Sequence, residues 1–238
     1  MTPFDSRLLR LFNQFAQGSW LFDKTMVFLS TDPFITGGIA MTFFWWAWFR
    51  KTNRKDREVI LSGLAASLIA LFVARGLATI LPFRDRPYLN PDLHFRPPFG
   101  TAEYYRDLIH WSSFPSDHAV LYFSLATCIY LVSRRAGILA YCHALFIVCL
   151  PLVYLGEHYP TDILAGALLG IGVASLSAIQ GFHERLSRPP LRLLGHSPAQ
   201  FYTCFFMCSF LFATNFNSVR KITFYALHAI VGSSHAQF

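Results

Sequence analysis

The sequence predicts an all-α, polytopic membrane protein, a single domain over residues 1–238 that forms a bundle of about six transmembrane helices. Only 14% of the 238 residues are charged, against about 25% in soluble domains. Apolar residues make up 54% of the chain and aromatic residues 17%, and the apolar residues gather in stretches long enough to cross a bilayer. With a mean hydropathy of +0.39, the composition excludes a disordered chain and a small disulfide-stapled scaffold.

Residues 1–30 are predicted to form a helix that lies on the membrane surface. Apolar side chains such as Phe4 and Phe12 alternate with charged ones such as Arg7 and Arg10, which is typical of an amphipathic interfacial helix. The charges also interrupt the continuous apolar segment that a signal peptide needs, so we expect no cleavage here.

Six apolar stretches follow. The first five comprise residues 33–49, 59–82, 115–133, 136–156 and 163–182. The sixth, residues 201–216, is short for a span, since about 17 residues is the usual lower limit. Residues 183–238 are therefore expected to hold a basic loop, a sixth span and a tail whose form the sequence leaves open.

Basic residues cluster directly after the first, third and fifth apolar stretches, at residues 50–57, 134–135 and 185–192. Loops rich in Lys and Arg stay on the cytoplasmic side of a membrane, so residues 83–114 and 157–161 are expected to share the opposite, outer face. Because the net charge of +7 comes from these short clusters, nucleic acid is not an expected partner.

The outer face is expected to collect polar residues that suit an anion. Ser116, Asp117 and His118 follow a proline, which places them in the first turn of a helix, where free N–H groups and the helix dipole attract negative charge. His158 and Asp162 lie at the start of the fifth span. Two helix starts that carry two histidines fit a phosphate site.

Arg84 and Arg86, in the connection before these helices, would add cationic ligands for the same anion. Each residue also has a structural interpretation: Ser116 as a helix cap, the arginines as anchors for lipid head groups, and His118 or His158 as interfacial histidines. Their joint occurrence at one face favours the phosphate site. Carboxylates do not cluster there with His or Cys at ligand spacing, so no metal or other cofactor is expected.

In this order, the residues resemble the type 2 phosphatidic acid phosphatase superfamily. The family pattern is Lys-x6-Arg-Pro, then Pro-Ser-Gly-His, then Ser-Arg-x5-His-x3-Asp. The match covers about residues 75–170 and includes Arg86-Pro87, Pro-Ser-Asp-His ending at His118, and His158-x3-Asp162. Residues 21–23, and Asp117 in place of Gly, look like the bacterial undecaprenyl-diphosphate phosphatase branch. The resemblance implies a six-helix membrane bundle and metal-free hydrolysis through a phosphohistidine.

Residue by residue, the resemblance implies that His158 is the nucleophile, that Asp162 orients and charges its imidazole, and that His118 protonates the leaving oxygen. Arg86 and Ser116 would hold phosphate oxygens, beside Asp117 and Arg84. The implied partner is a lipid phosphate such as a polyprenyl diphosphate. The implied location is a bacterial inner membrane, with the site on the periplasmic or outer face.

Two positions depart from the family pattern. Thr79 stands where the family has Lys, and Leu152 stands where it has Arg, so two cationic phosphate ligands are missing. Arg84 is the better candidate for a substitute, because Arg75 is expected to lean toward the N-terminus of its helix and away from the site.

The departures leave two alternatives to a lipid phosphatase. One is a phosphotransferase of the same superfamily, which moves the phosphoryl group to a lipid or sugar hydroxyl. The other is a non-catalytic lipid-phosphate binder or transporter, which the retention of His118, His158 and Asp162 opposes.

Overall fold

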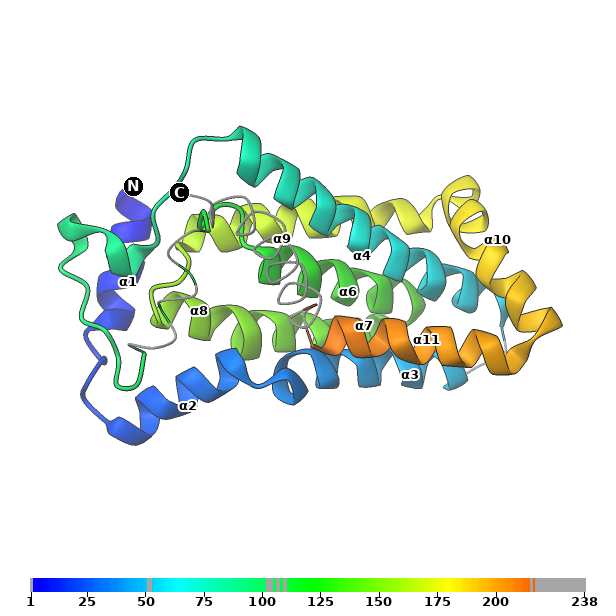
Figure 1. Cartoon of the computed structure of the whole chain (residues 1–238), viewed down its shortest axis with the longest axis horizontal. Helices are drawn as coiled ribbons and strands as arrows, with labels where there is room; N and C mark the ends of the chain where they lie inside the picture. The colour runs from blue at the N-terminus through cyan, green and yellow to red at the C-terminus, as the bar shows by residue number, and fades with distance from the viewer. Residues whose placement is uncertain are drawn as a thin grey trace, which may run out of the picture.

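The computed structural model describes residues 2–50, 53–101, 105, 108, 111–214 and 216, and every regular element in this part of the chain is a helix (Figure 1). This confirms the all-α class. The α-helices are α1 (Pro3–Asn13), α2 (Trp20–Thr31), α3 (Ile39–Arg50), α4 (Arg54–Ile80), α6 (Asp117–Val132), α7 (Arg134–Cys142), α8 (Leu150–Tyr154), α9 (Pro160–Ser175), α10 (Gln180–His196) and α11 (Pro198–Ala213). The π-helical segments are η1 (Phe34–Gly38) and η4 (His143–Cys149), and the 3-10 turns are η2 (Pro87–Leu89), η3 (Pro91–Leu93) and η5 (Leu176–Ala178).

Within the described residues, three helical segments are long and apolar enough to cross a membrane: Arg54–Ile80, Arg134–Tyr154 and Pro160–Ala178. A fourth is added if α2 and Phe34–Arg50, bent by 61°, are one span. The apolar helices α6 and α11 have 16 residues each, so at about 1.5 Å per residue they are shorter than the roughly 30 Å hydrocarbon core. The multi-pass membrane class is confirmed, and the expected number of six spans stays a prediction.

The N-terminal segment differs from the expected single interfacial helix. It forms two helices, because the Ser19 hydroxyl accepts a hydrogen bond from the N–H of Phe22 and so caps a second helix start. The second helix, α2, leads directly into η1 and α3. Residues 20–50 therefore form one bent pair of helical segments, and α1 is a separate helix before it.

The expected basic loop at residues 183–192 is a helix, α10. His183 and Ser187, one turn apart, are buried against the bundle, and Leu191, Leu193 and Leu194 pack against the core. This burial on one face outweighs the two prolines inside the helix. The fifth span is shifted toward the N-terminus of the chain, since it comprises Pro160–Ala178 and not residues 163–182. The sixth apolar stretch forms α11, and the tail after residue 216 lies outside the described residues.

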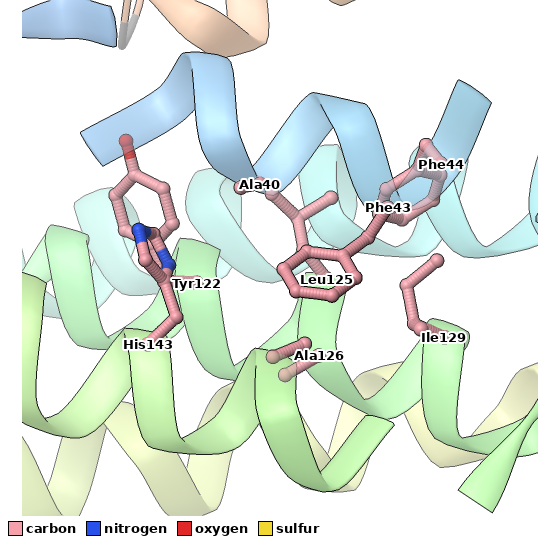
Figure 2. A pocket seen from close by; sticks show the side chains of 9 residues that line it. Ala40, Phe43, Phe44, Tyr122, Leu125, Ala126, Ile129 and His143 are labelled. Carbon is pink, nitrogen blue, oxygen red and sulfur yellow. The ribbon is translucent and has the colours of Figure 1, made fainter. Parts of the chain in front are cut away.

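Helix α6 is the centre of the bundle and packs against α3, α4, α7 and α9. Figure 2 shows the contact between α3 and α6, where aromatic and aliphatic side chains interdigitate and Tyr122 and His143 close one end. The cavity among them has a volume of about 10 Å³, which is hardly room for one water molecule. This part of the core is therefore filled and offers no space for a ligand.

The ends of the bundle differ in character. The starts of α6 and α9, together with α1, lie at one end, and α10 lies at the other (Figure 1). We call the first the outer end, since it carries residues 83–101 and 157–161. The basic clusters lie at the opposite end, where α3 ends at Arg50 and α7 begins at Arg134.

Candidate active site

The starts of α6 and α9 are held side by side. The N–H of Ser116 donates to the carbonyl of Asp162 at 3.3 Å. Further along α9, a Cβ on Gly166 would lie 2.6 Å from the Ser116 carbonyl oxygen, and Gly170 is equally crowded by the α6 backbone. Two glycines one turn apart thus allow a close approach, which brings both predicted helix starts to the outer end.

His158 lies in the loop between α8 and α9 and is 5% exposed. Its Nδ1 atom is 2.8 Å from the carbonyl oxygen of Ser113. A carbonyl can only accept, so in the neutral imidazole Nδ1 carries the proton and Nε2 keeps its lone pair. Ser113 is itself fixed, because its N–H donates to the carbonyl of Arg84 at 2.9 Å and its hydroxyl to that of Asp85 at 3.3 Å.

Asp162 is fully buried in the first turn of α9. Its Oδ2 atom accepts from the N–H of Tyr159 at 2.8 Å and lies 3.8 Å from Nδ1 of His158. That distance is too long for a hydrogen bond. Asp162, which the resemblance expects to orient the imidazole, therefore acts on it as a nearby charge and not through a hydrogen bond.

Arg84, expected as a phosphate ligand, has partners within the fold on both terminal nitrogens. One terminal nitrogen, NH1, donates to Oδ1 of Asp162 and to the Thr161 hydroxyl, and the other, NH2, donates to Oδ2 of Asp5 at 3.0 Å. The guanidinium also lies over the ring of Tyr159, 4.0 Å from its centroid. Two buried carboxylates, those of Asp162 and Asp5, thus bind the two terminal nitrogens of Arg84.

Arg86 has the properties of a phosphate ligand. It is 6% exposed, NH1 donates to the carbonyl of Glu157 at 2.9 Å, and Nε donates to that of Leu108 at 3.3 Å. Neutral carbonyls fix the side chain without cancelling its charge, and a guanidinium has further N–H donors for an anion.

Ser116 and Asp117 both have partners within the fold. Ser116 is fully buried and caps α6, because its hydroxyl accepts from the N–H of Ala119 at 3.4 Å. Asp117 forms an ion pair with Arg75, whose guanidinium lies 4.8 Å from the ring centroid of Trp111. Arg75 therefore reaches the start of α6, contrary to the expectation that it leans away.

His118 is half-buried in the same first turn of α6, and its ring stacks on Tyr122 with centroids 6.4 Å apart. Thr79 and Leu152, the two positions that depart from the family pattern, supply no cation to the site. Thr79 is exposed and donates to the carbonyl of Gly76, and Leu152 is 1% exposed in the core.

Helix α1 contributes a residue that the sequence did not single out. Asp5 is fully buried and binds Arg84, the N–H of Thr161 at 3.0 Å and the hydroxyl of Thr161 at 2.9 Å. The end of α1 is fastened as well, since Asn13 exchanges two hydrogen bonds with the backbone of Arg96. The available sequence signal was the spacing of Thr2 and Asp5, which is typical of a capping box.

No group of three or more His, Cys, Asp and Glu side chains is arranged to hold a metal ion in the part of the chain that the structure describes.

A family model described as the PAP2 superfamily matches residues 64–185, just over half of the chain. The bacitracin transport permease protein BcrC of Bacillus licheniformis is 34% identical over 127 residues, which are 52% of this chain and 56% of that protein. The chain thus spans little more than half the length of this relative. No solved structure matches. The matched segment contains Arg86, His118, His158 and Asp162, and Asp5 lies outside it.

Proposed function

Because the chain belongs to the PAP2 superfamily, we propose that it is a membrane-embedded phosphatase, which hydrolyses a polyprenyl diphosphate or a related lipid phosphate through a phosphohistidine at His158. The observation that carries the proposal is the 2.8 Å contact between Nδ1 of His158 and the Ser113 carbonyl. This contact fixes the tautomer in which Nε2 has a free lone pair.

In the first step, Nε2 of His158 forms a bond to phosphorus while the bond from phosphorus to the leaving oxygen breaks, and His118 gives that oxygen a proton. With Nδ1 still protonated, the phosphorylated ring is a cation. The Asp162 carboxylate, 3.8 Å away, stabilises it. In the second step, water attacks phosphorus and returns a proton to His118, and the bond to Nε2 breaks.

The phosphoryl oxygens gain negative charge in both steps. Arg86 supplies its remaining N–H donors, and the first turn of α6 supplies backbone N–H groups and a positive helix end. Arg75, paired with Asp117 at the same turn, is a further cation nearby. A lipid is the supported substrate class, because the site lies at one end of an apolar, multi-pass bundle.

The deciding experiment measures release of free phosphate by purified protein in detergent, with a polyprenyl diphosphate or phosphatidic acid and with excess chelator. We expect turnover by the wild-type protein and loss of more than about 99% of it in His158→Ala, since the nucleophile is removed. His196→Ala is the matched control, because His196 is exposed at the opposite end of the bundle. If His158→Ala keeps more than a few per cent of the rate, the phosphohistidine mechanism is wrong.

A phosphotransferase is the second candidate, and the outward Thr79 and the buried Leu152 favour it, since both cationic ligands are absent from the site. In the same assay, a transferase would release little phosphate in water and would move it to an added alcohol in a reaction that still needs His158.

A further inference from the structure

Asp5 is a buried acid that the family segment does not include. It lies in the first turn of α1, fully buried, and its partners Thr161 and Arg84 are 156 and 79 residues away along the chain. Helix capping does not account for this burial. The capping contact uses only the N–H of Thr2, at a long 3.5 Å from Oδ2. The shorter hydrogen bonds of the Asp5 carboxylate all run to Arg84 and Thr161, at the candidate active site.

The geometry around Arg84 shows what Asp5 does there. The guanidinium has two terminal nitrogens, and Asp5 holds NH2 at 3.0 Å. NH1 is then the terminal nitrogen that reaches Asp162, and it reaches Oδ1. Oδ2 of Asp162 is left to the N–H of Tyr159 and to the imidazole of His158.

The alternative arrangement is the one that arginine and carboxylate prefer. Left to itself, a guanidinium pairs with a carboxylate through two parallel N–H bonds, which claim both oxygens. Such a pair between Arg84 and Asp162 would cancel the carboxylate charge beside His158. With Asp5 present, one guanidinium serves two carboxylates, and the cluster of three keeps a net negative charge next to the ring.

We propose that Asp5 is a positioning residue of the active site: it holds Arg84 by one nitrogen, so that Oδ2 of Asp162 stays directed at His158. The inference rests on the proposed function, because it is through the cationic phosphohistidine that the free oxygen matters. Helix α1 is then part of the catalytic unit as well as a surface helix.

The test compares three variants in the phosphate-release assay. Asp5→Asn keeps the shape and the acceptor for the N–H of Thr161 but removes the charge that holds Arg84. We expect kcat to fall about tenfold or more with KM changed less than about twofold, because stabilisation of the intermediate is lost and substrate contacts are not. Asp5→Glu should recover much of kcat, since it restores the charge. Thr2→Ala, which removes the cap of α1 but no contact to the site, is the matched control and should stay near wild type.

A double-mutant cycle separates positioning from a general loss of stability. If Asp5 acts through Arg84, adding Asp5→Asn to Arg84→Ala should change kcat less than about twofold, although Asp5→Asn alone lowers it. Equal effects of Asp5→Asn in both backgrounds, or an equal loss in Thr2→Ala, would overturn the inference. So would a wild-type protein that releases phosphate and loses it in His158→Ala but keeps it in Asp5→Asn. Absence of turnover in the wild-type protein would instead overturn the proposed function, and the inference with it.

Discussion

Arg84 and Arg86 lie two residues apart, yet their partners give them different tasks. Arg84 is bound to the carboxylates of Asp5 and Asp162, and Arg86 is bound to two neutral carbonyls. A guanidinium between carboxylates has much of its charge compensated, whereas one between carbonyls keeps it. Only Arg86 of the two is therefore expected to act directly on phosphate.

We predict that Arg86→Ala lowers kcat/KM by about 10²-fold or more, since a fixed cation next to developing phosphoryl charge is lost. Arg86→Lys should recover little, because one ammonium cannot bond two carbonyls and a phosphate in the same fixed geometry. Arg96→Ala, an exposed arginine of the same outer connection, is the control for a change of net charge. Steady-state kinetics on the lipid substrate provide the check, and an Arg86→Ala rate within about twofold of wild type would contradict it.

The motif spacing predicted which side chains gather at the outer end but not all of their contacts. His158 and Asp162 are four residues apart, but His158 precedes the helix that begins at Pro160, so they do not share a helix face. The Ser113 carbonyl could not be foreseen, since every residue has a backbone carbonyl. Asp5 was missed because its partners are distant in sequence and because its spacing from Thr2 is typical of a local capping box.

At the scale of elements, the contact between α6 and α9 decides whether the site forms. Gly166 lies against the Ser116 carbonyl, and His118 lies two residues after Ser116 in the same first turn of α6. We predict that Gly166→Ala lowers turnover at least about tenfold and destabilises the fold by about 1–3 kcal/mol, because a methyl group there pushes the two helix starts apart. Gly172→Ala in the same helix meets open space and should leave both unchanged. Activity and thermal unfolding in detergent test the pair, and equal behaviour of the two variants would refute it.

Apolar stretches predicted the helices of the bundle because a span needs little more than length and hydrophobicity. Their ends were less predictable, since ends depend on tertiary contacts. The basic segment at residues 183–192 reads as a loop by composition, and it is helical because His183 and Ser187 are buried against the bundle. In the same way, the cap at Ser19 divides a stretch that hydropathy treats as one helix.

The docking of α1 is predicted to depend on pH. Burial raises the pKa of Asp5, but hydrogen bonds from the N–H and hydroxyl of Thr161 and the charge of Arg84 outweigh it, so the pKa lies below its ordinary value of 3.8. A carboxyl with a lowered folded pKa stabilises the docked state above that ordinary value, and the contribution is lost as the pH falls through the folded pKa.

Spin labels at Arg10 of α1 and Leu164 of α9, both exposed positions, measure this docking. The distance distribution should be narrow at pH 5 and broaden at a pH well below 3.8, the ordinary pKa of the carboxyl. In Asp5→Asn the change with pH should disappear. A wild-type distribution that is identical at both pH values would mean that Asp5 does not hold the helix.

For the whole molecule, the separation of charge between the two ends is expected to set the orientation in the membrane. Helix α10 and the C-terminal end of α3, which carry basic residues, lie at the end of the bundle opposite α1 (Figure 1), and clusters of Lys and Arg stay in the cytoplasm. In a background without the five native cysteines, we predict that Arg10→Cys reacts with an impermeant maleimide added to intact cells, and that Arg188→Cys reacts only after the membrane is opened. Both arginines are exposed, so a difference between them reports sidedness and not burial.

Because Arg10 shares its helix with Asp5, labelling of Arg10→Cys from outside would also place the candidate active site on that side, within reach of lipid phosphates in the outer leaflet. Labelling of Arg188→Cys in intact cells would reverse the orientation and with it the leaflet that the enzyme serves.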